Sequence, residues 1–179
     1  MRVMTKSKIS AFIFSLLIVV SSCTQTKENK TKITHNYQKE GLSINLPFNW
    51  KVKNDYFKEG NRYIELDKYT NYKVESTMAI SIFNQKLSAD SILNDQINQL
   101  QFFYQKVNFK IISKNNPTHL GKFDCITTYY EADDTKDKVY GEVGVMHYKD
   151  KTITLQIVEN KNNTDRSDYN FMFNTFIIK

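Results

Sequence analysis

The chain has 179 residues, with 25 Lys and Arg against 19 Asp and Glu, and a formal net charge of +6. This length suits one domain, and two Cys and three His exclude a disulfide scaffold and a multi-cysteine zinc site. Because 40% of the residues are hydrophobic, the chain has enough apolar surface to fold. A positive net charge would suit a nucleic-acid partner if it lay on the folded domain, so the positions of the charged residues decide whether such a partner is expected.

The first 22 residues are predicted to be a secretory signal peptide. Three cations, at positions 2, 6 and 8, precede an apolar stretch over 9–20, which is shorter than the roughly 20 residues of a spanning helix. The stretch ends in Val20-Ser21-Ser22-Cys23, which resembles a bacterial lipobox. That resemblance implies cleavage before Cys23 and lipidation of Cys23, with acyl chains such as palmitate holding the protein at a membrane. The alternatives are an ordinary signal peptide with an incidental Cys and a short membrane anchor.

The positive charge is concentrated outside the expected domain. Without residues 1–22, 22 cations face 19 anions, a charge of +3. The polar segment 23–40 is predicted to be a lipidated Cys followed by a flexible tether. Without this tether as well, a single domain over 41–179 keeps 18 cations against 17 anions. A nearly neutral body of this kind does not suit a nucleic-acid partner.

Alternation of apolar and polar residues predicts an antiparallel sheet. Its expected strands are 42–46, a short piece around Val52, 61–67, 73–83, 109–112, 123–132, 139–148 and 152–159. Residues 115–118 are expected to break the strand after 109–112, and 133–137 to form a polar hairpin loop. Trp50 is expected to anchor the core, the alternative being a platform for a ligand.

Two segments have helical periodicity instead. Over 88–107 five apolar residues recur at spacings of four and three, after Ser88 as the N-cap, and this helix is expected to cover the apolar face of the sheet. A last helix is expected with Ser167 or Asp168 as its N-cap, and Ile177 and Ile178 are expected to form a short strand or a packed tail. The predicted fold class is therefore α+β, an antiparallel sheet flanked by helices.

The order of these elements resembles the PsbP-like family, which includes bacterial periplasmic lipoproteins. The resemblance is carried by Ile44-Asn45-Leu46-Pro47-Phe48-Asn49-Trp50, by 88–107 followed by Phe109-Lys110-Ile111-Ile112, and by Asn174-Thr175-Phe176. It implies the α/β sandwich of that family over nearly all of 41–179. It implies no manganese or calcium site, because no metal-binding positions of the family have counterparts here.

No catalytic residues are predicted, and no metal or cofactor is expected. Cys125 is in phase with apolar strand residues and is expected to pack in the core. His35, His119 and His147 lack metal-ligand spacing. The acidic residues Glu131, Asp133, Asp134 and Asp137 lack the pattern of a calcium loop, so a solvated loop is expected there.

A segment that interleaves bases and aromatics, 53–73, is the first place to expect a partner or ligand surface. Its candidate residues are Tyr56, Phe57, Arg62, Tyr63, Tyr69 and Tyr72. The alternative is that these are ordinary, partly buried aromatics.

Together these features predict a non-enzymatic accessory or binding module that a lipid anchors in the bacterial cell envelope. Its partners would be the membrane and an unidentified envelope protein or small ligand. Thr24, rather than an Asp, follows Cys23, which favours the outer membrane with the domain facing the periplasm. The alternatives are a carrier or sensor of a small apolar ligand held between sheet and helix, and an enzyme with a site that no motif reveals.

Overall fold

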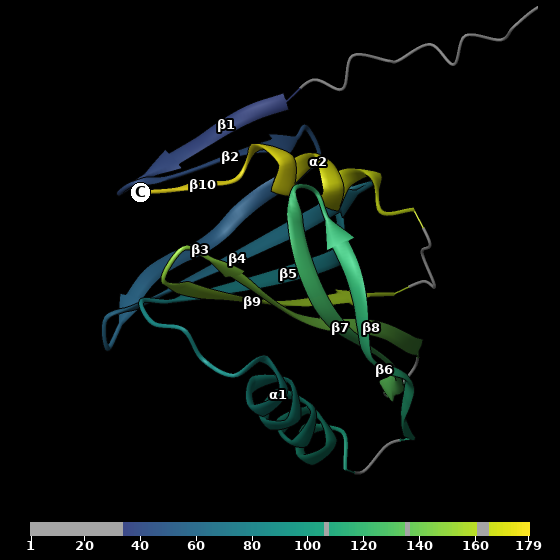
Figure 1. Ribbon diagram of the computed structural model, residues 1–179. Coiled ribbons are helices and arrows are strands. Elements are labelled where there is room, and N and C mark those ends of the chain that lie inside the picture. The colour runs from purple at the N-terminus through teal and green to yellow at the C-terminus, as the bar shows by residue number, and fades with distance from the viewer. Residues whose placement is uncertain (1–33, 106–107, 135–136, 161–164) are drawn as a thin grey trace, which may run out of the picture. The chain divides into compact units, whose positions relative to one another are not determined.

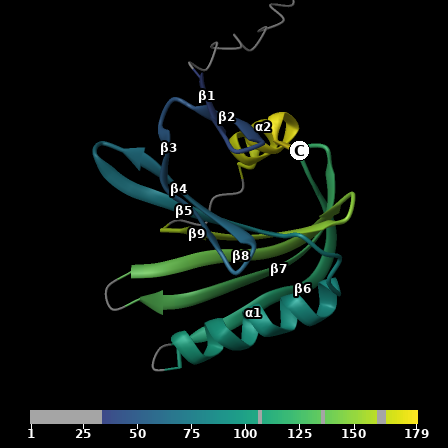
Figure 2. The same ribbon diagram turned by 90° about the vertical axis from the view of Figure 1, so that its left-hand side faces the viewer.

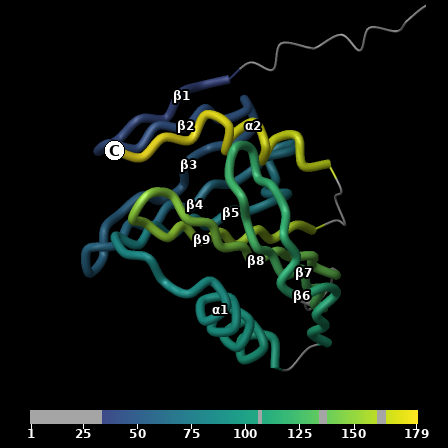
Figure 3. The backbone as a smooth tube through the Cα atoms, in the orientation of Figure 1, coloured from purple at the N-terminus to yellow at the C-terminus, as the bar shows by residue number. Residues whose placement is uncertain are grey.

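The computed structural model describes residues 34–105, 108–134, 137–160 and 165–179. They form two antiparallel sheets and two helices (Figure 1), which confirms the predicted α+β class. The smaller sheet has the order β1-β2-β10, with β1 at Thr34–Lys39, β2 at Leu42–Pro47 and β10 at Ile177–Ile178. Figure 3 shows these three strands side by side at the end of the molecule where the chain terminates.

The larger sheet has seven strands in the order β3-β4-β5-β9-β8-β7-β6. Their bounds are β3 Trp50–Lys58, β4 Asn61–Thr70, β5 Lys73–Phe83, β6 Phe109–Leu120, β7 Phe123–Asp134, β8 Asp137–Tyr148 and β9 Lys151–Glu159. The expected meander is β7-β8-β9, and β9 then pairs with β5 along its length. Helix α1 spans Ala89–Phe103 and helix α2 spans Ser167–Thr175.

Two hydrophobic clusters lie on opposite faces of the larger sheet. Figure 2 shows α2 on one of these sides and α1 on the other. The first joins β4, β5 and β9 to the smaller sheet and α2, and its members include Trp50, Met78 and Phe173. The second joins α1 to β7 and β8 through Leu93, Val143 and their neighbours. Trp50 is fully buried, so its predicted place in the core is confirmed.

Helix α1 covers a different face from the one predicted. The apolar face of β5, which includes Met78 and Ile80, is covered by α2 and the smaller sheet. Strand β8 has apolar residues pointing both ways, and Val143 and Val145 supply the surface for α1. The periodicity of β5 cannot reveal this, because the choice of face depends on β8.

The tether prediction is wrong for residues 34–39, which form β1. Their polar side chains hide the strand from sequence analysis, yet β1 pairs with all six residues of β2. A buried charge cluster also holds it. Asp55 on β3 accepts hydrogen bonds from the Tyr37 hydroxyl at 2.5 Å and from the Arg62 guanidinium, which also donates to the backbone carbonyls of Lys39 and Glu40.

The predicted break at 115–118 is also wrong, because β6 continues through these residues, with two shifts of register in its pairing to β7. Asn115 adopts a positive φ of 52° there, and its backbone N–H donates to the Thr128 hydroxyl. Pro117 is tolerated because β6 is an edge strand, where a missing N–H costs no ladder hydrogen bond.

The helix ends differ in detail from the prediction. Helix α1 keeps Ser88 as its N-cap but ends at Phe103, with Tyr104 at the C-cap, while Val107 lies outside the described residues. At α2 the N-cap is Arg166 rather than Ser167 or Asp168, and Asp165 accepts a hydrogen bond from the Ser167 N–H instead. The carboxylate of Asp168 is engaged by Trp50 and Lys68.

Candidate functional site

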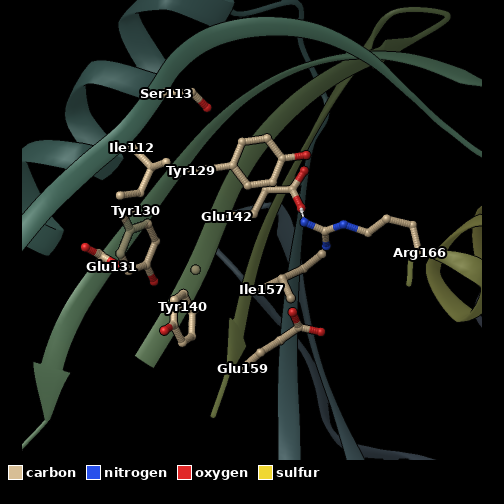
Figure 4. A pocket seen from close by; sticks show the side chains of 11 residues that line it. Ile112, Ser113, Tyr129, Tyr130, Glu131, Tyr140, Glu142, Ile157, Glu159 and Arg166 are labelled. Carbon is tan, nitrogen blue, oxygen red and sulfur yellow. Dashed lines mark ion pairs between the residues drawn. The ribbon is translucent and has the colours of Figure 1, made fainter. Parts of the chain in front are cut away.

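A pocket of about 470 Å³ lies where the strands β6 to β9 meet the start of α2. Its size suits a small organic ligand. Figure 4 shows its lining side chains, which include the charged or hydroxyl-bearing Tyr129, Glu142, Glu159 and Arg166. The other labelled residues are Ile112, Ser113, Tyr130, Glu131, Tyr140 and Ile157. Tyr130 borders the pocket, but its ring belongs to the α1 cluster on the opposite face.

Strand register brings the two buried carboxylates of this pocket to one face. Glu142 on β8 pairs with Ile157 on β9, and Tyr140 pairs with Glu159. Because alternate residues of a strand point the same way, Glu142 and Glu159 both project toward α2. Glu142 is 5% exposed and Glu159 is 6% exposed.

Arg166 places a guanidinium inside this acidic pocket. Its Nη2 lies 2.5 Å from the Glu142 carboxylate, and its guanidinium carbon lies 5.4 Å from the Tyr129 ring centroid and 5.3 Å from that of Tyr169. Two aromatic faces and a carboxylate therefore hold one cation. The Nη1 atom of Arg166 is buried without a hydrogen-bond partner among the described residues.

Tyr169 links the pocket to the core. Its hydroxyl donates to Glu159 at 2.6 Å, and its ring packs edge-to-face on Trp50 with centroids 5.5 Å apart. Burial, followed by the hydrogen bond to Glu159, raises the pKa of Tyr169. The hydroxyl therefore stays protonated and remains a donor to Glu159 at physiological pH.

Burial raises the pKa of Glu142 above its ordinary value of 4.5, and the nearby Glu159 acts in the same direction. The Arg166 guanidinium and the Tyr129 hydroxyl oppose this shift without cancelling it. The cause is the burial of the Glu142 carboxylate itself, whose lost hydration its partners do not fully replace.

This shift leads to a prediction about pH. Between pH 4.5 and the raised pKa, the folded state holds a proton on Glu142 that the unfolded state has released. Glu142 therefore contributes a loss of stability as the pH rises through this window. We expect Glu142→Gln to remove that part of the slope, which urea unfolding of both proteins between pH 4 and pH 7 would measure. Identical slopes in the two proteins would contradict the raised pKa.

The residues predicted from 53–73 do not form one surface. Tyr56 stacks on Tyr63 with centroids 5.5 Å apart, whereas Phe57 and Arg62, one position along in the register, lie on the opposite face of the hairpin. Arg62 is 5% exposed and bound to Asp55, so the geometry removes it from a contact surface. Tyr69 packs near the Lys51 ammonium, and Tyr72 is fully exposed at a turn.

The other candidate side chains have structural neighbours. Glu131 meets Lys138 at 3.3 Å and Lys110 at 4.0 Å, His119 meets Asp124 at 2.9 Å, and His147 lies 3.3 Å from the Thr152 hydroxyl. His35 lies on the exposed strand β1, and Asp133 is exposed at the end of β7. The side chains of Asp134 and Asp137 lie outside the described part. Within that part no three His, Cys, Asp or Glu gather as metal ligands.

Cys125 is 3% exposed and belongs to the core cluster of α2 and the smaller sheet, which confirms its predicted packing. Burial raises its pKa to about 12, so almost no thiolate is present at neutral pH. We expect the peptide that contains Cys125 to remain unlabelled by iodoacetamide in the native protein and to react fully in 6 M urea. Mass spectrometry after proteolysis would measure the labelling, and rapid native labelling would contradict the burial.

Sequence analysis missed Glu142, Glu159, Arg166 and Tyr129. The signal available was Glu142, a charge inside the apolar run 139–146, since buried carboxylates need partners. Its partner Arg166 lies 24 positions further along the chain. Nothing in the spacing of these residues indicates their contact.

The chain matches no protein-family model, and no curated protein sequence matches it. Among solved structures it is similar to a protein of Bacteroides thetaiotaomicron VPI-5482, with a TM-score of 0.50 and 15% identity over 80% of this chain. The match covers 48% of that protein, so this chain spans about half of its length. A likeness at this identity concerns the fold alone. Among the described residues, neither helix combines the length and apolar character needed to cross a membrane.

Proposed function

We propose that this protein is a non-enzymatic binding module, anchored by lipid in the bacterial cell envelope, that takes a small ligand into the pocket of Glu142 and Arg166. The pocket carries this proposal, because two carboxylates more than nine-tenths buried meet there with a guanidinium, and a cavity lined by a few converging polar and ionisable groups is typical of a ligand site. The strands that hold these carboxylates are central in the larger sheet, which gives a ligand a rigid wall.

Lipidation at Cys23 is the proposed means of anchoring. Ten residues, 24–33, separate Cys23 from β1, and even fully extended they span at most about 35 Å. The domain would thus stay close to the membrane surface, which we place at the periplasmic side of the outer membrane. Metabolic labelling with palmitate tests this anchor: label should be incorporated by the natural chain and not by Cys23→Ala.

Localisation requires a separate measurement. We expect the protein in the outer-membrane fraction and protected from protease in intact cells, but digested once the outer membrane is opened. Digestion in intact cells would place the domain at the cell surface. Recovery with the inner membrane would contradict the outer-membrane assignment.

The PsbP-like arrangement is part of the same proposal. It is supported by the position of α1 on one face of the larger sheet and of α2 on the other. Trp50, which belongs to the first segment of the resemblance, packs against Tyr169 of α2. The Asn45 N–H of the same segment donates to the Thr175 hydroxyl at 3.0 Å, so the first and last segments of the resemblance meet.

The alternative expected from the sequence is a carrier or sensor of a small apolar ligand held between sheet and helix. The space between the larger sheet and α1 is filled by core side chains such as Leu93, Ile97 and Val143. A ligand would therefore enter the pocket beside α2, whose charged side chains favour a ligand with polar groups over a wholly apolar one.

Native mass spectrometry of protein isolated from its own membranes tests the binding function. We expect a bound small molecule in the natural protein, less of it in Glu142→Gln, and no change in Glu65→Gln. Glu65 is a matched control because it lies on the opposite face of the sheet, paired with Lys53 at 2.7 Å. A ligand-free mass under gentle conditions would contradict binding, and Glu142-dependent turnover in a hydrolase screen would contradict the non-enzymatic assignment.

A further inference from the structure

We infer that the ligand of this pocket carries a cation, a primary ammonium or a guanidinium on a small aromatic or alkyl body, and that Arg166 occupies the place of this cation in the empty protein. This inference rests on the proposed binding function and specifies its ligand class. Its basis is the contact geometry of Arg166 together with the charges that line the pocket.

The pocket is acidic on its inner surface. Three of the four charged side chains that line it are carboxylates, namely Glu131, Glu142 and Glu159, and the fourth is Arg166. Glu131 meets Lys110 and Lys138 near the protein surface. Glu142, which is almost fully buried, attracts a cation more strongly than a surface carboxylate does because little water screens it.

Arg166 shows how a cation is accommodated. Its guanidinium lies near the rings of Tyr129 and Tyr169 while it pairs with Glu142. These are the elements of a site for organic cations: aromatic faces and a carboxylate. A ligand cation that replaced the guanidinium would find the same three groups, and Tyr140 and Ile157 lie beside them to contact its body.

The Arg166 side chain is also able to move away from Glu142. It is the N-cap residue of α2, makes no capping hydrogen bond through its side chain, and keeps 26% of that side chain exposed. One guanidinium nitrogen is buried and makes no hydrogen bond to any residue of the described part of the chain, so the contact with Glu142 leaves one donor of Arg166 unsatisfied there. Rotation of the side chain into solvent would hydrate that nitrogen and release Glu142 to the ligand.

The Arg166 guanidinium competes with the ligand cation for Glu142. Substitution of Arg166 should therefore tighten binding of the ligand. The test measures binding of 2-phenylethylamine, of its neutral counterpart 2-phenylethanol and of the anion phenylacetate by isothermal titration calorimetry. We expect the amine to bind the natural protein at least about tenfold more tightly than the alcohol or the anion, which corresponds to about 1.4 kcal/mol. Agmatine, in the same series, tests the guanidinium.

Three variants separate the roles of the groups. Glu142→Gln should weaken amine binding about tenfold or more, since a charge-assisted hydrogen bond is lost. Arg166→Gln should strengthen amine binding severalfold, and Glu65→Gln should leave it unchanged. Circular dichroism spectra and unfolding midpoints of all three variants show whether the fold is kept.

Several results would overturn the inference. Equal binding of amine and alcohol would exclude recognition of charge. Binding of phenylacetate that Arg166→Gln abolishes would show that Arg166 is an anion receptor. If no compound binds while native mass spectrometry still finds a ligand that depends on Glu142, the cation class is wrong and the binding function stands. If neither experiment finds a ligand, the proposed function itself fails.

Discussion

Substitution of Arg62 by Met should lower the free energy of unfolding by about 3–5 kcal/mol, because it leaves the buried Asp55 carboxylate without its charge partner. Arg62 and Asp55 are 5% and 3% exposed at the side chain, and their closest atoms lie 2.6 Å apart. The same guanidinium donates to two backbone carbonyls between β1 and β2, so its loss should also loosen the β1–β2 hairpin. Urea unfolding followed by circular dichroism would give the free energy, and hydrogen exchange the local loosening.

A double-mutant cycle distinguishes a lost pair from lost packing. We expect Asp55→Asn together with Arg62→Met to cost less than the sum of the two single changes, because the second change removes the charge that the first leaves unpaired. Strict additivity would show that the two side chains act independently. Lys110→Met, which removes an exposed partner of Glu131, serves as a control and should cost less than about 1 kcal/mol.

The Asp55 cluster also has a pH dependence of known sign. Burial acts to raise the pKa of Asp55, but the hydrogen bonds from Arg62 and Tyr37 outweigh it and hold the pKa below the ordinary 3.8. The stabilisation is therefore complete above the ordinary pKa and is lost as the pH falls through the lowered one. This direction is opposite to that of Glu142, whose contribution weakens as the pH rises.

Substitution of Trp50 by Ala should cost about 3–5 kcal/mol, the usual range for a large aromatic removed from a packed core. Trp50 is fully buried, packs edge-to-face on Tyr169, and donates from Nε1 to Asp168 at 3.2 Å. Trp50→Phe keeps a ring but loses the hydrogen bond to a carboxylate, so we expect a smaller cost of about 1–3 kcal/mol. Trp50 is the single Trp of the chain, so both variants lose the tryptophan fluorescence signal. Unfolding is therefore followed by circular dichroism.

Trp50→Ala should also weaken ligand binding at the candidate site. Tyr169 donates to Glu159 and lies beside Arg166, so Trp50→Ala removes the support on which Tyr169 rests. We expect weaker amine binding in Trp50→Ala and nearly natural binding in Trp50→Phe, measured by calorimetry below the unfolding transition. Equal affinity in both variants would show that the pocket does not depend on the packing of Trp50 against Tyr169.

The position of Gly141 shows why the site escapes sequence analysis. The ring of Tyr130 lies so close to Gly141 that an added Cβ would stand 2.0 Å from its Cζ atom. A larger residue would displace the ring or the strand. Gly141 thus adjoins both the α1 cluster and the pocket. Its lack of a side chain makes room for the Tyr130 ring only because β7 and β8 pair, and the sequence Tyr140-Gly141-Glu142 does not reveal that contact.

From the sequence alone, the α+β class, the meander β7-β8-β9, the helix α1 and the buried positions of Trp50 and Cys125 follow, because alternation and helical spacing are local signals. The tertiary structure alone decided which face α1 covers, that polar 34–39 form a strand, and that Glu142, Glu159 and Arg166 share one pocket. The physical reason is that these features depend on contacts between distant segments, such as Arg62 with Lys39 or Glu142 with Arg166. The residue spacing along the chain carries no trace of such contacts.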